Sequence, residues 1–278
     1  MNKGISFHFG YVYDDVEQQV KDIKDAGFDC VITTADPAFD HQNSNIKNQV
    51  RLFKKYGLKL SSLHMRYKRE ELPHFWTDDK IGDKVEKDLK KDIKIAKKYG
   101  FKCVVVHLRG VPNEIGYKRL YRILKLCEKC NVPIAVENTH ILNCVDRVLA
   151  DISHPYLKFC YDSGHNHCFN GEQDYLIRYK DRLAALHLHD NLGPQPKKSQ
   201  LKGFTVQKES LDMHTLNKYG SIDWKEIAEQ LAQVEAPINL DYEILMVYRK
   251  GETAKEVLKE TYAQACELEA MIEGYKVK

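Results

Sequence analysis

The chain has 278 residues, 43% of them hydrophobic, and its 43 basic and 40 acidic residues leave a formal net charge of only +3. This length suits one large domain or two small ones, and so balanced a charge excludes general electrostatic attraction to nucleic acid. No run of about 18 apolar residues predicts a membrane span, and the N-terminus has no apolar signal core, so we expect no membrane association and a cytoplasmic location.

Short runs rich in β-branched residues alternate with segments of helical spacing along the whole chain. The predicted strands cover residues 5–9, 28–33, 58–63, 102–107, 132–137, 157–161, 183–187 and 237–242. The predicted helices cover residues 14–26, 43–56, 84–99, 117–130, 142–151, 174–179, 223–234 and 253–272. Gly27, Gly57 and Gly100 each follow a helical segment, as is typical of helix C-termini.

Strands that alternate with helices indicate parallel β-α-β units. Eight such units in 278 residues predict an α/β fold of the (β/α)8 TIM barrel type, as a single domain spanning residues 1–278. The alternative is an open doubly wound sheet, which usually has a glycine-rich phosphate turn after its first strand. Residues 8–11 read His-Phe-Gly-Tyr, which is not such a turn.

Eight cysteines occur, and Cys30, Cys103 and Cys160 lie inside apolar runs. Buried, reduced thiols of this kind are typical of cytosolic proteins. Cys127 and Cys130 form a C-x-x-C pair, but a redox or zinc role requires a second pair or a thioredoxin-like context. We therefore interpret this pair as helical thiols without a chemical role.

Carboxylate and imidazole side chains recur where the predicted strands end. In a barrel these ends face one pocket, so residues far apart in sequence are expected to meet there. The set comprises His64, His107, Glu137, Asp162, His165, His187, Asp212, His214 and Glu243. These residue types bind divalent metals through oxygen or imidazole nitrogen, and their recurrence at successive strand ends favours a metal site over isolated structural polar groups.

Five short motifs together resemble the xylose isomerase-like barrel superfamily over nearly the whole chain. They are Asp162-Ser163-Gly164-His165, His187-Leu188-His189-Asp190, Asp212-Met213-His214, Val136-Glu137-Asn138 and Asp241-Tyr242-Glu243. The superfamily contains sugar isomerases and epimerases, inosose dehydratases and endonuclease IV enzymes. The motifs are therefore specific to the superfamily and poorly specific for the reaction.

The isomerase and epimerase members imply that Glu137, Asp162, His187 and Glu243 hold one Mn²⁺ or Zn²⁺, with Mg²⁺ as a further candidate. Glu137 and Glu243 would be the catalytic residues, exchanging a proton on opposite sides of a sugar carbon through an ene-diolate. His165 and His189 would bind substrate, with His189 alternatively supporting the metal ligand His187. The implied partner is a small-molecule sugar or sugar phosphate.

The endonuclease IV members imply a different reading of the same positions. His64, His107, His165, Asp212 and His214 would extend the site to three zinc ions suited to phosphodiester hydrolysis in abasic DNA. The balanced charge disfavours nucleic acid as a partner, because phosphate contacts dominate duplex binding. A non-catalytic metal-binding or sugar-binding barrel is a third alternative. Substrate, number of metal ions and oligomeric state stay open.

Some features depart from the sugar epimerases or allow two interpretations. The second strand ends Thr33-Thr34-Ala35-Asp36, and no arginine follows His187 in its loop, so sugar recognition does not transfer in detail. Phe75 and Trp76 either cover the site or pack beneath their loop. Lysines of the loop after the seventh strand are interpreted as solvated rather than ligand-binding, and further histidines as structural or surface groups. These are Lys197, Lys198, Lys202, Lys208, His140, His154 and His167.

Overall fold

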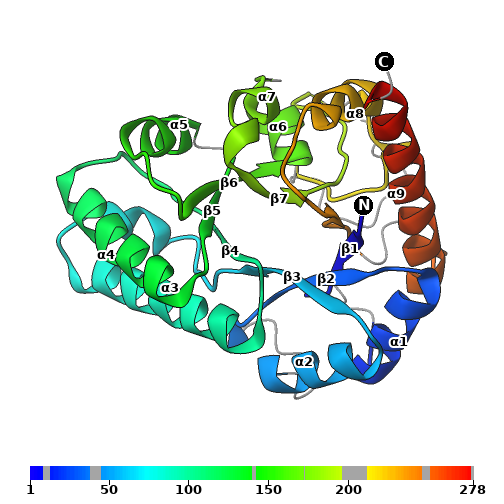
Figure 1. Ribbon diagram of the computed structural model, residues 1–278, viewed down its shortest axis with the longest axis horizontal. Helices are drawn as coiled ribbons and strands as arrows, with labels where there is room; N and C mark the ends of the chain where they lie inside the picture. Colours follow the sequence, from blue (N-terminus) through cyan, green and yellow to red (C-terminus); the bar gives the residue numbers. More distant parts are fainter. Residues whose placement is uncertain are drawn as a thin grey trace.

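The computed structural model describes residues 1–8, 13–37, 45–139, 142–171, 173–195, 212–245 and 251–276. Eight parallel strands surround a central axis, which confirms the predicted (β/α)8 barrel (Figure 1). The strands are β1 Lys3–Ser6, β2 Cys30–Thr34, β3 Lys59–His64, β4 Cys103–Val106, β5 Ile134–Glu137, β6 Leu157–Asp162, β7 Leu183–His187 and β8 Leu240–Tyr242. Their order around the sheet is β7-β6-β5-β4-β3-β2-β1-β8.

The barrel closes between β7 and β8 through a parallel bridge that joins Leu188 to Tyr242. The Leu188 N–H donates to the Asp241 carbonyl at 2.9 Å, and the Glu243 N–H donates to the Leu188 carbonyl at 3.0 Å. Closure at this point brings the end of β7 beside the end of β8, although more than fifty residues separate them in the sequence.

Helices surround the strands (Figure 1). They are α1 Val16–Ala26, α2 Ile46–Lys55, α3 Lys80–Tyr99, α4 Glu114–Cys130, α5 Leu142–Asp151, α6 Ser163–Phe169, α7 Tyr175–Arg178, α8 Trp224–Ala232 and α9 Ala254–Lys276. Short 3₁₀ turns are η2 Leu72–Trp76, η3 Lys180–Arg182 and η4 Asn217–Tyr219. The N-terminus lies close to α9, where Lys3 Nζ pairs with Glu269 Oε2 at 2.6 Å.

Local side chains explain where several helices begin and end. The Asp79 carboxylate accepts the Gly82 N–H and starts α3, and the Asn113 side chain caps the first turn of α4 in the same way. These caps place both helix starts three or four residues before the ranges predicted from hydrophobic spacing. At the end of α1, Gly27 has a φ of 111°, and a Cβ there would lie 2.7 Å from the Tyr262 ring, so glycine is required.

The hydrophobic core has two parts because successive strand side chains point to opposite faces. In β4, Val104 and Val106 pack outward under the helices, whereas Cys103 and Val105 point into the barrel. The interior cluster consists of small side chains, completed by Ala135, Cys160 and Ala185. These small residues fill the middle of the barrel, and the larger polar side chains lie at the carboxyl end of its strands.

The structure corrects some element boundaries and adds four short elements among the described residues, of which α6 and η2 are the longest. β1 begins at Lys3, which pairs with Leu240 of the neighbouring β8, and ends at Ser6, rather than covering residues 5–9. α6 and η2 were not predicted, because segments of seven and five residues are too short to show helical periodicity. Phe75 and Trp76 are buried in η2, and Trp76 packs edge-on against Tyr117, so they pack beneath their loop rather than covering the site.

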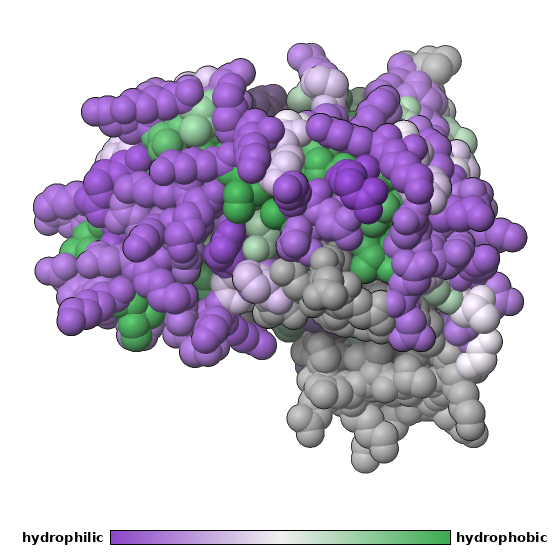
Figure 2. Space-filling model, turned by 90° about the horizontal axis from the view of Figure 1, so that it is seen from below, coloured by the Kyte–Doolittle hydropathy of each residue, from purple (hydrophilic) through white to green (hydrophobic). Residues whose placement is uncertain are grey.

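All eight cysteines are free thiols, as expected. None of the helices in the described ranges is long and apolar enough to cross a membrane. Large hydrophobic side chains exposed on described residues are few: Ile81, Val111, Ile115 and Tyr121. The face shown in Figure 2 is accordingly mainly hydrophilic, with scattered hydrophobic side chains.

Candidate functional site

The predicted strand-end residues meet at the carboxyl end of the barrel. His64, Glu137, Asp162 and His187 are the last residues of β3, β5, β6 and β7, while His107 and Glu243 directly follow β4 and β8. His64, His107, Glu137 and Glu243 line a cavity of about 80 Å³ together with further polar side chains, whereas Asp162 and His187 lie behind its lining. The lining consists of His8, Thr34, His64, Tyr67, His107, Glu137, His165, Asp212, His214 and Glu243.

A first triad consists of His64, His107 and Glu137, whose potential ligand atoms lie within 4.8 Å of one another. The two histidine Nε2 atoms are 3.1 Å apart, and His107 Nε2 lies 3.1 Å from Glu137 Oε2. His64 Nδ1 donates to the Met65 carbonyl at 3.0 Å, since a carbonyl can only accept. This bond leaves the lone pair of a neutral His64 on Nε2, directed at the other two residues.

A second triad consists of Asp162, His187 and Glu243, and all three side chains are buried. His187 Nδ1 lies 3.5 Å from Glu243 Oε2 and 3.1 Å from Glu137 Oε2. The two glutamates therefore approach the same imidazole nitrogen from β5 and β8, which are three strand positions apart around the closed barrel.

A third triad consists of His189, Asp212 and His214. The imidazoles of His189 and His214 stack with ring centroids 3.9 Å apart, and His214 Nε2 lies 3.2 Å from Asp212 Oδ2. His214 has a φ of 45°, in the left-handed region, and its Nδ1 donates to the Glu243 carbonyl at 2.8 Å. This bond holds a strained residue in place and again directs Nε2 toward the triad.

His165 connects the triads. Its Nδ1 lies 3.1 Å from Glu137 Oε1, and its Nε2 lies 3.1 Å from Asp212 Oδ2. His189 lies deeper and is fully buried, with Nε2 3.0 Å from Asp162 Oδ1. Of the two histidines predicted to bind substrate, His165 therefore lines the cavity and His189 does not.

The start of α6 positions several of these groups. The Asp162 carboxylate accepts the His165 N–H at 2.6 Å and so caps the helix, while the Ser163 hydroxyl donates to the His189 carbonyl at 2.7 Å. A Cβ on Gly164 would lie 1.9 Å from His189 Cε1. The Asp-Ser-Gly-His sequence thus allows the His189 ring to pack directly on the helix backbone.

Burial and the dense charge shift the pKa values of the site in a consistent pattern. Burial acts to lower the pKa of His187, but Glu243 and Glu137 outweigh it and raise the pKa to about 10. For His214, Asp212 likewise outweighs burial and raises the pKa to about 9. Burial acts to raise the pKa of Glu137, but His107 and His187 hold it well below its usual value. Without a metal ion, the carboxylates are therefore balanced by protonated imidazoles.

His64 behaves differently. Burial, together with the neighbouring His107, lowers the pKa of His64 to about 3, so this imidazole is neutral at physiological pH. A neutral imidazole with a directed lone pair is the form that binds a metal ion.

The residues fit a divalent cation. Three buried imidazole nitrogens, both of His187 and Nδ1 of His165, make no aligned hydrogen bond among the described residues. Glutamate oxygens nevertheless lie about 3 Å from His165 Nδ1 and from His187 Nδ1. Imidazole nitrogens and carboxylate oxygens that converge without mutual hydrogen bonds are typical of metal ligands, because a shared cation satisfies all of them. The mixed nitrogen and oxygen donors suit Zn²⁺ or Mn²⁺.

Asp190, which belongs to the motif after β7, is not part of the cluster. Its Oδ1 accepts the Ser221 and Ile222 N–H groups at 2.9 and 3.1 Å, and its Oδ2 accepts Trp224 Nε1 at 2.6 Å. Its backbone forms two hydrogen bonds with Thr215, next to His214. Asp190 therefore anchors the segment that carries the third triad.

Three lining residues, His8, Thr34 and Tyr67, were not predicted to belong to the site. Thr34 directly follows the predicted strand 28–33 and ends β2, so the strand-end rule would have found it. His8 lies inside the predicted strand 5–9, so only the true end of β1 at Ser6 places it beyond the strand. Tyr67 lies three residues beyond β3, and no sequence signal marks it. Its ring packs against His107 with centroids 4.8 Å apart.

The remaining residues singled out in the sequence have structural or peripheral positions, or lie outside the described residues. His154 pairs with Glu128 at 3.3 Å, and His167 Nε2 lies 2.8 Å from the Ser221 hydroxyl, both away from the cavity. His140, Lys197, Lys198, Lys202 and Lys208 lie outside the described residues.

The fold and its clustered carboxylates and imidazoles define a (β/α)8 barrel with a candidate metal centre at the carboxyl end of its strands. The model of the xylose isomerase-like TIM barrel family matches residues 20–261, and the chain belongs to this family. Among curated proteins, the uncharacterized Sinorhizobium fredii protein y4fM is 31% identical over 127 residues. The match covers 43% of this chain and only 36% of that relative.

Solved structures share the fold at low sequence identity. A D-tagatose 3-epimerase-like protein superposes with a TM-score of 0.71 at 16% identity, covering 100% of this chain and 99% of the other. A xylose isomerase domain protein from Alicyclobacillus acidocaldarius has a TM-score of 0.71 at 12% identity, over 99% of this chain and 100% of the other. The IolI protein, solved with a bound zinc atom, has a TM-score of 0.69 at 15% identity, over 99% of both chains.

Proposed function

We propose that this protein is a divalent-metal-dependent isomerase or epimerase that acts on a sugar or sugar phosphate. The observation that carries the proposal is the placement of Glu137 and Glu243, which approach His187 Nδ1 from different walls of the barrel. The epimerase and isomerase names of the structural neighbours support it as an analogy of fold.

The proposed metal ligands are Glu137, Asp162, His187 and Glu243, and the proposed ion is Zn²⁺ or Mn²⁺, with Mg²⁺ less suited to imidazole. When bound, the cation would supply Lewis-acid stabilisation of negative charge on neighbouring sugar oxygens. Asp162 is held in place by its hydrogen bond to the His165 N–H and by its contact with His189 Nε2. His189 would therefore act by positioning Asp162.

Glu137 and Glu243 are the proposed bases. Burial acts to raise the pKa of Glu243, but His187 outweighs it and lowers the pKa, so both carboxylates stay ionised and able to accept a proton. One would remove a proton from a sugar carbon and the other would return a proton to it. His165 lines the cavity and would donate a hydrogen bond to a substrate oxygen.

The test is incorporation of solvent deuterium into a panel of ketoses and cyclic polyol ketones, with Mn²⁺ or Zn²⁺ supplied. We expect exchange by the native protein and a loss of at least about 100-fold in Glu137→Gln and in Glu243→Gln. Glu229→Gln, on the exposed side of α8, is the matched control and should retain full exchange. Tight sugar binding without exchange would instead identify a non-catalytic binding barrel.

A second candidate is a phosphodiesterase with three metal ions. The observation in its favour is that, of five overlapping groups of potential metal ligands among the described residues, three share no residue: His64–His107–Glu137, Asp162–His187–Glu243 and His189–Asp212–His214. Such a set is suited to stabilising the charges of phosphodiester hydrolysis. Elemental analysis of protein purified without chelators separates the two, since about one ion per chain supports the isomerase and about three support the hydrolase. Zinc-dependent nicking of an abasic DNA duplex is the direct assay.

A further inference from the structure

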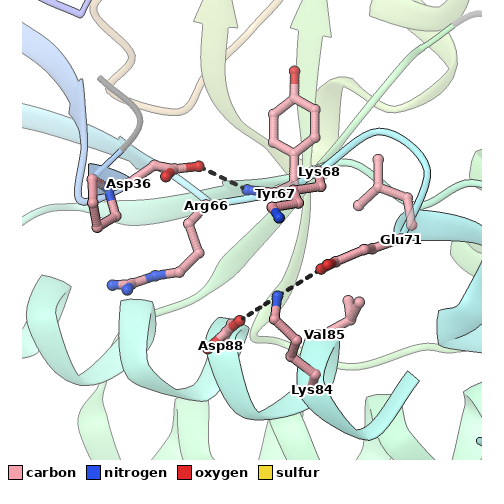
Figure 3. Close-up of a pocket in the computed structure, with 10 residues that line it drawn as sticks. Asp36, Arg66, Tyr67, Lys68, Glu71, Lys84, Val85 and Asp88 are labelled. Atoms are coloured by element: carbon pink, nitrogen blue, oxygen red, sulfur yellow. Dashed lines mark hydrogen bonds and ion pairs between the residues drawn. The ribbon is translucent and has the colours of Figure 1, made fainter. Parts of the chain in front are cut away.

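A second pocket adjoins the cavity of the candidate metal centre, and we name it the side pocket (Figure 3). It has a volume of about 210 Å³ and is formed by residues that follow β2 and β3 and by the first half of α3. Tyr67 lines both cavities. Its backbone N–H donates to Asp36 Oδ2 at 3.2 Å, and in Figure 3 its ring points away from Lys84 and Asp88. Tyr67 is therefore shared by the linings of the two cavities.

The side pocket is highly charged but electrically balanced. Three of its charged lining residues are cations and three are anions. These are Arg66, Lys68, Lys84, Asp36, Glu71 and Asp88. An anionic group such as phosphate needs an excess of cations, whereas a neutral ligand with many hydroxyl groups can use donors and acceptors equally.

Ion pairs hold the walls of the side pocket in place before any ligand binds. Lys84 Nζ lies 2.6 Å from Glu71 Oε2 and 3.2 Å from Asp88 Oδ2, and both pairs are visible in Figure 3. The Arg66 guanidinium pairs with the buried Asp92 at 2.7 Å. A ligand would therefore meet polar groups whose orientation is already fixed, which reduces the entropy lost on binding.

Two further features complete a surface suited to a sugar ring. Lys68 forms no ion pair with any other described residue, so its ammonium group can donate to a ligand. Leu72 and Val85 provide apolar surface between the charged groups. A hexose ring presents hydroxyl groups at its edge and C–H groups on its faces, which matches this combination of polar and apolar lining.

We propose that the side pocket binds a neutral hexose unit that is covalently attached to the sugar at the metal centre. The substrates would then be glycosides or disaccharides rather than free monosaccharides. This inference rests on the proposed function, because it takes the metal-centre cavity to hold the reacting sugar. Tyr67 would lie beside the bond that links the two units.

The probes are fructose and three disaccharides, lactulose, turanose and isomaltulose, which attach a hexose to different oxygens of fructose. Calorimetric titration of the purified protein should show that at least one disaccharide binds about tenfold more tightly than fructose. This ratio corresponds to about 1.4 kcal/mol. Lys68→Met removes a donor, and Val85→Phe fills the side pocket. Each variant should bind the disaccharide no more tightly than fructose and should leave fructose binding unchanged. Lys87→Met, on the exposed side of α3, is the matched control and should preserve the tighter binding of the disaccharide.

Equal binding of fructose and all three disaccharides would overturn the inference, and so would tighter binding of fructose 6-phosphate that Lys68→Met abolishes. Deuterium exchange measured on the same compounds separates this result from the proposed function. If fructose incorporates deuterium but no disaccharide binds more tightly than fructose, only the hexose-binding role of the side pocket is rejected. If a disaccharide binds in a way that depends on Lys68 but no compound incorporates deuterium, the hexose-binding role of the side pocket is retained and the proposed isomerase function is rejected.

Discussion

At the residue scale, the candidate site depends on backbone carbonyls that select the tautomers of its histidines. The Met65 carbonyl accepts from His64 Nδ1, and the Glu243 carbonyl accepts from His214 Nδ1. Both bonds leave Nε2 facing the carboxylates. The orientation of both imidazoles is thus set by carbonyls of residues that directly follow β3 and β8.

The raised pKa values of His187 and His214, about 10 and 9, predict that metal binding releases protons. At neutral pH both imidazoles are protonated in the metal-free protein. His187 must become neutral to bind the proposed single ion, and His214 must do so only in a site with three ions. Apparent affinity should therefore rise with pH up to about 10, the pKa of His187, by up to about tenfold per pH unit for each proton displaced. Calorimetric titration in buffers of different ionisation enthalpy measures the protons released. Release of no protons at pH 7 would show that neither imidazole binds the ion.

Asp190→Ala is predicted to destabilise the fold. Removing the carboxylate leaves the Ser221 and Ile222 N–H groups and the Trp224 indole without their acceptor. We expect the free energy of unfolding to fall by about 3 kcal/mol, measured by urea denaturation. The control is Asp181→Ala at an exposed position, which should change it by less than about 0.5 kcal/mol. Equal stabilities of the two variants would contradict the anchoring role.

At the element scale, α6 connects the packing of the barrel to the geometry of the site. Its first turn supplies the cap at Asp162, the glycine under His189 and the His165 side chain that lines the cavity. Because this helix starts directly at the end of β6, a change in its backbone would move residues of two triads together.

Gly164→Ala tests this connection. The added Cβ would lie 1.9 Å from His189 Cε1, so the imidazole must move away from Asp162. We expect a loss of about 2 kcal/mol in the free energy of unfolding from overpacking, together with weaker metal binding. Gly274→Ala in α9 has no atom within 4 Å of the new Cβ and should instead gain up to about 1 kcal/mol. Unchanged stability and metal affinity in Gly164→Ala would refute the close packing.

At the scale of the whole molecule, the candidate metal centre joins strands from around the barrel. Residues at the ends of β3, β5, β6 and β7 and after β4 and β8 contribute to it, so a bound cation would link segments that otherwise meet only through the sheet. Metal binding should consequently stabilise the entire barrel rather than one loop.

Thermal unfolding with and without metal measures this effect. At a free Zn²⁺ or Mn²⁺ concentration about 100 times the dissociation constant, the stabilisation should be about 2.7 kcal/mol. For a chain of this size that corresponds to a rise in Tm of roughly 5 to 10 °C. Ca²⁺, which prefers oxygen ligands alone, should give a smaller rise. The absence of a rise with every ion would mean that these residues do not form a metal site.

Most of the barrel could be predicted from the sequence because its signals are local. Strand and helix periodicity, with glycines such as Gly27 and Gly100 at helix ends, defined eight repeating units. The residues that cluster at the barrel end were predicted by position, since parallel strands in a barrel bring their carboxyl ends together. Boundaries such as that of β1 were missed because pairing with a strand remote in the sequence, β8, and not hydropathy, determines them.

The sequence by itself determined the number of β-α units and which acidic and imidazole side chains stand at the strand ends, because both follow from short-range spacing. Only the tertiary structure decided how those side chains group into potential metal sites, that Asp190 anchors a loop outside the cluster, and that Tyr67 lines both the cavity and the side pocket. These features depend on distances between strands and on partners such as the Glu243 carbonyl, which the closure of the barrel brings close although they are remote along the chain.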